Sequence, residues 1–301
     1  MSRNHSVYGP AQLVADARKL ARKFPFVNVQ TIGKSVLGKP ILAIRIGEGP
    51  FRWHFNGACH ANEWMTSLLL MRFARHYAKA CRERAQIGGK PARGLYARNT
   101  LWLVPMVNPD GVELVQQGMT PKHPYYKQLL QWNRGTSNFH RWKANVRGVD
   151  LNDQFPAHWE AERDRRGIDR PGPRDYGGTG PLTEPEAIAL AEWTRRTDPH
   201  AAIALHTQGE EIYWNYRDRE PAEAGEWAKR LGLASGYRPV WLEGSDAGYK
   251  DWFIETFRRP GFTVEAGWGH NPLPIEDAEN MYDDVMKLLT EALDLPAREP
   301  G

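Results

Sequence analysis

The stretch that most constrains this chain covers residues 53–64, which read WHFNGACHANEW. An apolar, aromatic run typical of a strand ends in small residues, and His60 and Glu63 follow before an amphipathic, helix-like pattern begins at Met65. Residues three apart share one face of a helix, so this imidazole and this carboxylate can bind one metal ion. Zinc takes such nitrogen and oxygen ligands, and a catalytic site uses three protein ligands and a water. We therefore interpret His60 and Glu63 as two of three zinc ligands.

Two further polar residues stand where apolar strand patterns end. His206 follows Ala-Ile-Ala-Leu, and Glu265 follows Gly-Phe-Thr-Val. In open α/β sheets, ligands bind outside the carboxyl ends of the strands. The pattern therefore predicts that His60, Glu63 and His206 bind the metal. Glu265 is expected to lie near the metal without binding it, and to act as a general base that takes a proton from an activated water.

Periodicity predicts alternating strands and helices. We expect helices at 8–24, 62–85, 183–197, 221–234, 246–257 and 274–293, and strands at 27–32, 41–46, 52–56, 100–107, 201–205, 212–216 and 262–264. Residues 33–40 are typical of a hairpin turn, and we expect strand 212–216 to pair with strand 201–205. Thr183 and Glu186 have the spacing of a capping box at a helix start.

This alternation favours the α/β class, with a mixed, mostly parallel open sheet that has helices on both faces. No repeat, linker or cell-wall-binding module is visible, so we expect one catalytic domain over residues 1–301, with its core at about 8–293. Residues 131–181 show no clear period but are rich in tryptophan, glycine and proline, which is typical of a long functional loop.

The composition limits which binding partners and which cellular compartment we expect. The net charge of +4 is spread along the chain without a block of like charge, which argues against nucleic acid as a partner. Cys59 and Cys81 are too few and too poorly placed for a disulfide framework. The start lacks a signal-type apolar core and no run approaches a membrane span, so we expect a soluble, cytoplasmic protein.

The ordered motifs resemble the zinc carboxypeptidase family over about residues 8–293. They are the His60-x-x-Glu63 pair, the turn NPDG at 108–111, GVDLN at 148–152, the late His206 and FTVE at 262–265. Within that family, the segments at 152–156, 206–214 and 271–274 are similar to those of bacterial γ-D-glutamyl-meso-diaminopimelate peptidases, which cut murein peptides.

This resemblance implies a role for each matching residue. It implies one Zn²⁺ ion bound by His60, Glu63 and His206, with Glu265 as general base and acid. It further implies that Asp150 orients the His60 imidazole, because a metal-bound histidine commonly donates its free N–H to a carboxylate. Asn152 would contact the carboxylate of the residue on the leaving side of the scissile bond.

A cation that polarises the scissile carbonyl is expected shortly before Gly148. The alignment prefers Lys143 for this position, with Arg141 and Arg147 nearby. Such a cation would stabilise the developing oxyanion, an effect worth a few kcal/mol in comparable sites.

The sequence departs from the family pattern at the residues that bind substrate. Asp153 stands where the family has an arginine that clamps the terminal carboxylate, so we expect it to attract an amine. Lys250, before the pair Asp251-Trp252, would place a cation in the specificity pocket. An acceptor and a cation together suit the zwitterionic end of meso-diaminopimelate. The family's mobile tyrosine position holds Glu243, and Tyr249 is the nearest candidate to replace it.

The resulting hypothesis is a zinc metallopeptidase that hydrolyses the γ-D-glutamyl-meso-diaminopimelate amide bond in murein peptides. Three alternatives stay open at this point: an N-acyl amino-acid amidohydrolase, an ordinary metallocarboxypeptidase, and a murein-peptide-binding protein without catalysis. A binding protein has no need of the base Glu265. The sequence does not address the oligomeric state.

Overall fold

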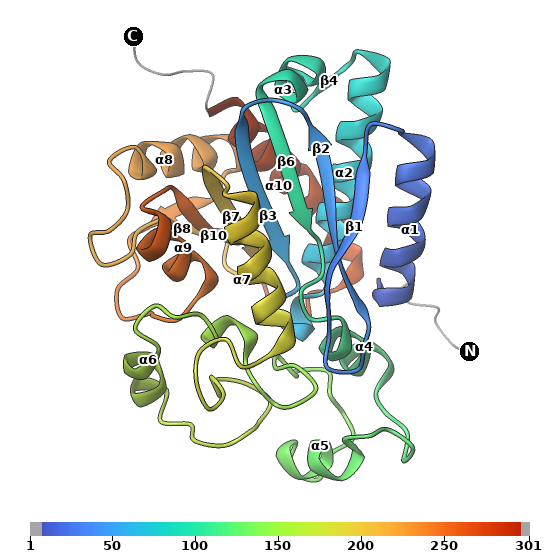
Figure 1. Cartoon of the computed structure of the whole chain (residues 1–301), viewed down its shortest axis with the longest axis vertical. Coiled ribbons are helices and arrows are strands. Elements are labelled where there is room, and N and C mark those ends of the chain that lie inside the picture. The colour runs from blue at the N-terminus through green and yellow to red at the C-terminus, as the bar shows by residue number, and fades with distance from the viewer. Residues whose placement is uncertain (1–7, 296–301) are drawn as a thin grey trace.

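A central sheet of eight strands organises the computed structural model, which describes residues 8–295 (Figure 1). The strand order is β1-β2-β6-β3-β7-β10-β8-β9. The strands are β1 (Asn28–Lys34), β2 (Pro40–Gly47), β3 (Phe51–Gly57), β6 (Asn99–Val104), β7 (Ala201–His206), β8 (Glu211–Tyr213), β9 (Arg238–Val240) and β10 (Gly261–Glu265). Strands β4 (Gln86–Ile87) and β5 (Lys90–Pro91) form a separate two-stranded sheet.

The central sheet is mixed and mostly parallel, as predicted. Strands β6, β3, β7 and β10 run parallel to one another, and β8 runs parallel to β9. The pairs β1–β2, β2–β6 and β10–β8 are antiparallel. The first of these pairs is the expected hairpin around residues 33–40.

Helices cover both faces of this sheet (Figure 1). The helices are α1 (Pro10–Lys23), α2 (Met65–Glu83), α3 (Ala92–Arg98), α4 (Pro109–Gln117), α5 (Tyr126–Trp132), α6 (Trp159–Arg166), α7 (Pro185–Thr197), α8 (Ala224–Ser235), α9 (Tyr249–Phe257) and α10 (Ala278–Asp294). Short 3-10 turns occur at η1 (Ala61–Glu63), η2 (Leu151–Asp153) and η3 (Ile275–Asp277). Residues of α1, α2, α3, α8 and α10 share one core with the sheet, and residues of α7 and α9 share the other.

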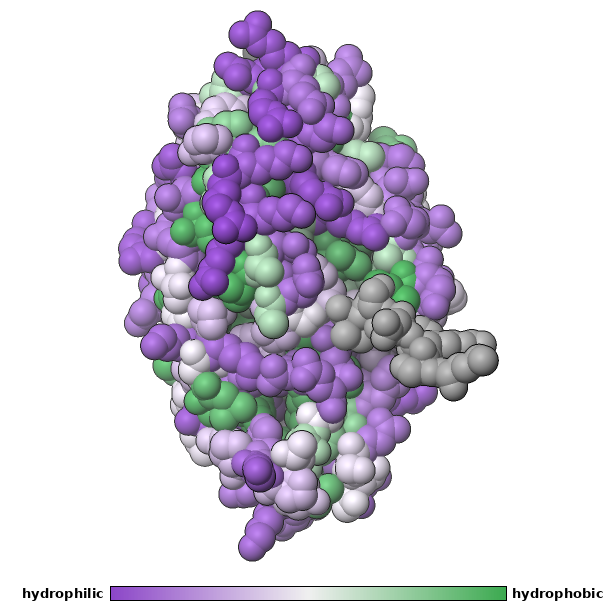
Figure 2. Space-filling model, turned by 90° about the vertical axis from the view of Figure 1, so that its right-hand side faces the viewer, coloured by the Kyte–Doolittle hydropathy of each residue, from purple (hydrophilic) through white to green (hydrophobic). Residues whose placement is uncertain are grey.

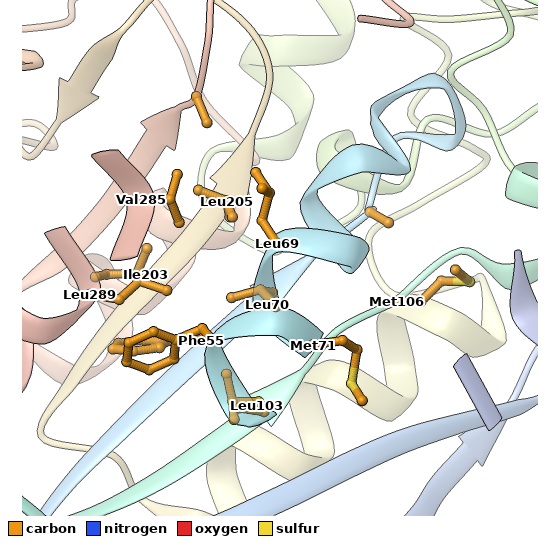
Figure 3. Packing of buried hydrophobic residues seen from close by; sticks show 14 of the residues in the cluster. Phe55, Leu69, Leu70, Met71, Leu103, Met106, Ile203, Leu205, Val285 and Leu289 are labelled. Atoms are coloured by element: carbon orange, nitrogen blue, oxygen red, sulfur yellow. The ribbon is translucent and has the colours of Figure 1, made fainter. Parts of the chain in front are cut away.

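The alternation of side chains along the strands produces these two cores. In β7, Ile203 and Leu205 face the first core, whereas Ala202 and Ala204 face the second. Figure 3 shows the first core from nearby, where sheet residues Phe55, Leu103, Ile203 and Leu205 lie among α2 residues Leu69, Leu70 and Met71 and α10 residues Val285 and Leu289. Each fully buried side chain of this size contributes about 1.5–3 kcal/mol, so the large core fixes the sheet that presents the site.

Strand β8 does not have the predicted neighbour. It pairs antiparallel with β10, with Glu211 level with Glu265 and Tyr213 level with Thr263. The prediction that this segment pairs with β7 is wrong, because β7 already has β3 and β10 as its two neighbours. Glu211 and Tyr213 consequently lie beside the strand that ends in Glu265.

The predicted capping box at Thr183 is also wrong. Helix α7 starts at Pro185 with Glu184 as its N-cap, and the Thr183 hydroxyl instead donates to Gln154 Oε1 at 3.2 Å. Glu186 turns inward and accepts a hydrogen bond from the Val36 backbone N–H at 3.1 Å. Tertiary contacts therefore use both side chains that the local spacing assigned to a cap.

Strand β9 forms one edge of the sheet. Arg238 N–H donates to the Glu210 carbonyl at 2.8 Å, and Pro239 lies level with Ile212 of β8. Backbone groups of successive strand residues point to opposite sides, so those of Pro239 point away from β8.

Figure 2 shows the face on the α1 side, where hydrophilic residues surround smaller apolar patches. A groove of about 510 Å³ lies between α1 and α2 and shares no lining residue with the cleft described below. Its lining includes the apolar residues Leu20, Phe24, Leu68 and Met71 and the cations Lys19, Lys23, Arg72 and Arg75.

Both cysteines, Cys59 and Cys81, are buried and free. Over residues 8–295, none of the helices has the length and apolar character that a bilayer crossing demands.

Candidate metal centre and cleft

The carboxyl ends of three neighbouring parallel strands position the site. Gly57 at the end of β3 lies level with Leu205, and Glu265 at the end of β10 lies level with His206 at the end of β7. After Gly57 the chain turns at Ala58, whose N–H donates to Thr66 Oγ1 at 2.7 Å. The Thr66 hydroxyl in turn donates to the Glu63 carbonyl at 2.8 Å, which ties the turn to the start of α2.

Asn108 anchors this turn to its neighbours. As the N-cap of α4, its Oδ1 accepts from the Gly111 N–H at 3.0 Å, and its Nδ2 donates to the carbonyls of Cys59 and Ala144, each at 3.2 Å. The Ala61 N–H donates to the Lys143 carbonyl at 2.8 Å. Hydrogen bonds from Asn108 and to Lys143 therefore fix the turn before the metal centre. The NPDG segment has a structural role, because its asparagine makes these contacts and caps α4.

His60, Glu63 and His206 converge on one point, as predicted. Their ligand atoms all lie within 4.8 Å of one another, and all three side chains are buried. His60 Nδ1 lies 2.9 Å from Glu63 Oε1, His206 Nδ1 lies 2.9 Å from Glu63 Oε2, and the two Nδ1 atoms are 3.2 Å apart. Two nitrogens bound to one tetrahedral zinc at about 2.0–2.1 Å lie about 3.3 Å apart, so the donor set fits zinc in type and spacing.

Asp150 lies behind the His60 ring. His60 Nε2 lies 3.1 Å from Asp150 Oδ1, while Asp150 Oδ2 accepts from the Asp175 N–H at 3.1 Å. A proton on Nε2 leaves the Nδ1 lone pair free for a metal. The structure thus brings Asp150 to the imidazole that the resemblance indicated.

Glu265 and Lys143 lie close to the three ligands, and the charge of Glu63 shifts the pKa of both groups. Burial, and then the Glu63 carboxylate, raise the pKa of the Glu265 carboxyl to about 8. Burial acts to lower the pKa of Lys143, but Glu63, whose Oε1 is 3.6 Å from the ammonium, and Asp150 outweigh it and raise that pKa. Lys143 therefore keeps its positive charge beside these carboxylates.

A cleft of about 330 Å³ opens over these groups. Its lining residues are Asn62, Glu63, Arg141, Lys143, Arg174, Thr207, Gln208, Glu265, His270 and Asn271. The cleft therefore brings together Glu63, Lys143 and Glu265 from the predicted site, together with Arg141. His270 lies in the loop after β10 and also lines the cleft.

The sequence reasoning missed Arg174 and Asn271. Arg174 reaches the cleft because the Pro173 carbonyl accepts from the Lys143 N–H at 2.9 Å, a tertiary contact without a local signal. Asn271 Nδ2 donates to the Thr207 carbonyl at 2.6 Å and lies 3.4 Å from Glu63 Oε1. Its position shortly after Glu265, in a loop with several glycines, could have indicated it.

Asn152 and Asp153 lie in η2, beside the cleft and outside its lining. The Asn152 N–H donates to Asp150 Oδ1 at 3.2 Å. Asp153 is buried, and Arg166 of α6 lies 3.3 Å from its carboxylate through Nε. Burial, and then the Asp150 carboxylate, raise the pKa of the Asp153 carboxyl to about 8 although Arg166 lies close. That Asp153 attracts an amine of the substrate stays a prediction.

The structure does not bring Tyr249 or Lys250 to the cleft. The Tyr249 hydroxyl lies 3.0 Å from Thr194 Oγ1, and its ring is buried in the second core. The Lys250 ammonium is buried, pairs with Asp251 Oδ1 at 2.5 Å and donates to the Asn215 carbonyl at 2.6 Å. Both of these contacts lie within the chain, and the role of Lys250 in substrate binding stays a prediction.

Comparisons with known proteins agree with this geometry. The zinc carboxypeptidase family model matches residues 13–271. The chain is 46% identical over 286 residues to γ-D-glutamyl-L-diamino acid endopeptidase 1 of Lysinibacillus sphaericus, covering 95% of this chain and 72% of that protein. It is 40% identical over 292 residues to the uncharacterised protein YqgT of Bacillus subtilis, covering 95% and 77%.

Solved structures show the same fold. Bovine thrombin-activatable fibrinolysis inhibitor, in complex with a tick carboxypeptidase inhibitor, has a TM-score of 0.75 at 17% identity, covering 98% of this chain and 99% of that one. Murein-tripeptide amidase MpaA of Escherichia coli O157 has a TM-score of 0.55 at 22% identity, covering 88% and 92%. With the matched family model, the sheet and the converging donor set, the chain belongs to the zinc carboxypeptidase family of metallopeptidases.

Proposed function

We propose that this chain hydrolyses the γ-D-glutamyl-meso-diaminopimelate amide bond in murein peptides. The observation that carries the proposal is that His60, Glu63 and His206 form one donor set and that Glu63 of this set lines the same cleft as Glu265. The relative at 46% identity is named for an endopeptidase that acts on a γ-D-glutamyl-L-diamino acid bond. We infer that the substrates are small soluble peptides in the cytoplasm, and that residues 8–293 act as one catalytic unit.

Each residue of the site has a place in the reaction. His60, Glu63 and His206 would hold a zinc ion, which would supply Lewis-acid activation of the scissile carbonyl and of a water. Glu265 takes a proton from the attacking water and delivers it to the amide nitrogen as the carbon–nitrogen bond breaks. The products are a γ-carboxylate on D-glutamate and a free amine on the diamino acid.

Lys143 and Asp150 support this chemistry from within the chain. The Lys143 ammonium, which lines the cleft near Glu63, faces the negative charge that develops on the carbonyl oxygen. Asp150 keeps the His60 ring in the tautomer with a free Nδ1. Asn152 contacts the carboxylate of the leaving residue in this proposal.

Release of free diaminopimelate from L-Ala-γ-D-Glu-meso-diaminopimelate tests the function. We expect release by the wild type, its loss after chelation, and its recovery with added zinc. Glu265→Gln should lower kcat by about 10²–10⁴-fold, because the amide side chain transfers no proton, while zinc binding persists. If protein that contains one zinc per chain releases no diaminopimelate, the murein assignment is wrong, and acylated amino acids and α-linked peptides become the substrates to screen.

A further inference from the structure

We propose that Arg141 and Arg174 bind the free α-carboxylate of the D-glutamyl residue on the acyl side of the scissile bond. This inference rests on the proposed function. In a γ-linked substrate the side-chain carboxyl forms the amide, so the α-carboxylate of the same residue stays charged. Four carbon–carbon bonds separate it from the scissile carbonyl carbon, which spans about 5 Å when extended. An α-linked residue with a neutral side chain has no such charge at this place.

The first observation is an excess of cations on the cleft. Arg141, Lys143 and Arg174 line it, against the two carboxylates Glu63 and Glu265. Lys143 already lies 3.6 Å from Glu63, and Glu63 also belongs to the metal donor set. The two carboxylates of the cleft therefore do not neutralise the two arginines, which can pair with an anionic group of the substrate.

The second observation is that neither guanidinium is saturated. Arg141 is exposed and has no hydrogen bond or ion pair with any residue of the described range 8–295. Arg174 donates through Nε to Asp175 Oδ2 at 2.9 Å, and its side chain is 56% exposed. The same Asp175 also accepts from Arg166 at 3.1 Å, so one carboxylate is shared by two guanidinium groups. Arginine presents several donors in a planar fork that suits a carboxylate.

The third observation is how the backbone places these arginines. The N–H groups of Lys143 and Ala144 both donate to the Pro173 carbonyl, at 2.9 and 3.1 Å, so the segment before Lys143 runs beside Arg174. The Lys143 carbonyl accepts from Ala61 N–H, which joins this pair of segments to the metal-binding turn. Asn152, assigned to the leaving side, stands outside the cleft lining. The proposal therefore assigns the arginines, which line the cleft apart from Asn152, to the acyl side.

Two matched substrates test the assignment. The first is L-Ala-γ-D-Glu-meso-diaminopimelate, and the second carries D-isoglutamine, in which a neutral carboxamide replaces the α-carboxylate. The leaving side is identical in both. We expect Arg141→Ala and Arg174→Ala to lower kcat/KM on the acid by about 10–100-fold, the value of a hydrogen bond to a charged group, and to change the amide substrate by less than about threefold. Arg170→Ala, an exposed arginine of the same long segment outside the cleft lining, should leave both rates unchanged.

The outcomes separate the inference from the function beneath it. Equal losses on both substrates, or a wild type that cleaves the amide as well as the acid, would overturn the assignment while hydrolysis itself stands. A third substrate, L-Ala-γ-D-Glu-L-Lys, lacks the distal carboxylate of diaminopimelate. If the effect of the arginine variants disappears on that substrate alone, the arginines bind the leaving side and the assignment is wrong. If none of the substrates is cleaved, the proposed function fails instead.

Discussion

Asp150 is buried behind a metal ligand and makes three contacts with its two oxygens. Oδ1 lies near His60 Nε2 and accepts from the Asn152 N–H, and Oδ2 accepts from the Asp175 N–H. Carboxylates in this position fix the orientation of the ligand ring and raise its basicity. The strength of metal binding should therefore depend on a residue that does not touch the metal.

We expect Asp150→Ala to weaken zinc affinity by about 10–100-fold. Asp150→Asn should lose less, because its amide oxygen can still accept from the imidazole. Competition with a chromophoric chelator measures the affinity, and circular dichroism shows whether the variants stay folded. Asp169→Ala, an exposed aspartate of the same long segment, is the control. An unchanged affinity in folded Asp150→Ala would show that the carboxylate does not position His60.

The residues at strand ends were predictable, and those that depend on long loops were not. His206 and Glu265 could be placed from sequence because parallel strands end at one edge of the sheet. Arg174 could not be placed in this way, because it reaches the cleft through the hydrogen bond from the Lys143 N–H to the Pro173 carbonyl. The pairing of Asp153 with Arg166 likewise needs the fold of α6.

At the scale of elements, α7 meets the hairpin turn through a buried carboxylate. Glu186 accepts from the Val36 N–H at 3.1 Å, and Asn145 Nδ2 lies 3.4 Å from its other oxygen. Burial raises the pKa of the Glu186 carboxyl to about 7. The local spacing of Thr183 and Glu186 predicted a cap, but long-range contacts determined the role of both residues. The short helices α3, α4, α5 and α6 were not predicted at all.

Glu186 should make stability depend on pH. Its pKa is higher in the folded than in the unfolded chain, so the folded state binds more protons between about pH 4.5 and pH 7, and the free energy of unfolding falls as pH rises through this range. Glu186→Gln removes this loss, which is at most about 3 kcal/mol. We expect urea unfolding to show the variant gaining stability relative to the wild type from pH 5 to pH 8. Glu192→Gln, exposed on the same helix, should follow the wild type, and a wild-type-like slope in Glu186→Gln would contradict the expectation.

At the scale of the whole molecule, the site joins segments that are distant in sequence. Glu63 and His206, whose side chains lie 2.9 Å apart, are separated by 143 positions. They meet only when β3 and β7 pair at the centre of the sheet. A metal that binds both therefore binds the native topology and not the unfolded chain, so zinc adds its binding free energy to the stability of the fold.

The edge strand β9 has a consequence for how copies of the protein behave at high concentration. An open sheet edge is a template for strand addition by a second molecule. Pro239 puts a ring where such a strand would need an N–H donor, since its backbone groups point away from β8. We expect Pro239→Val to self-associate as concentration rises in sedimentation-velocity runs, whereas Pro121→Val, in an exposed turn, should sediment like the wild type. A Pro239→Val protein that stays as monodisperse as the wild type would show that the ring is not the barrier. If Pro239→Val does self-associate, one residue at the edge of the sheet determines how concentrated a solution of this enzyme can become.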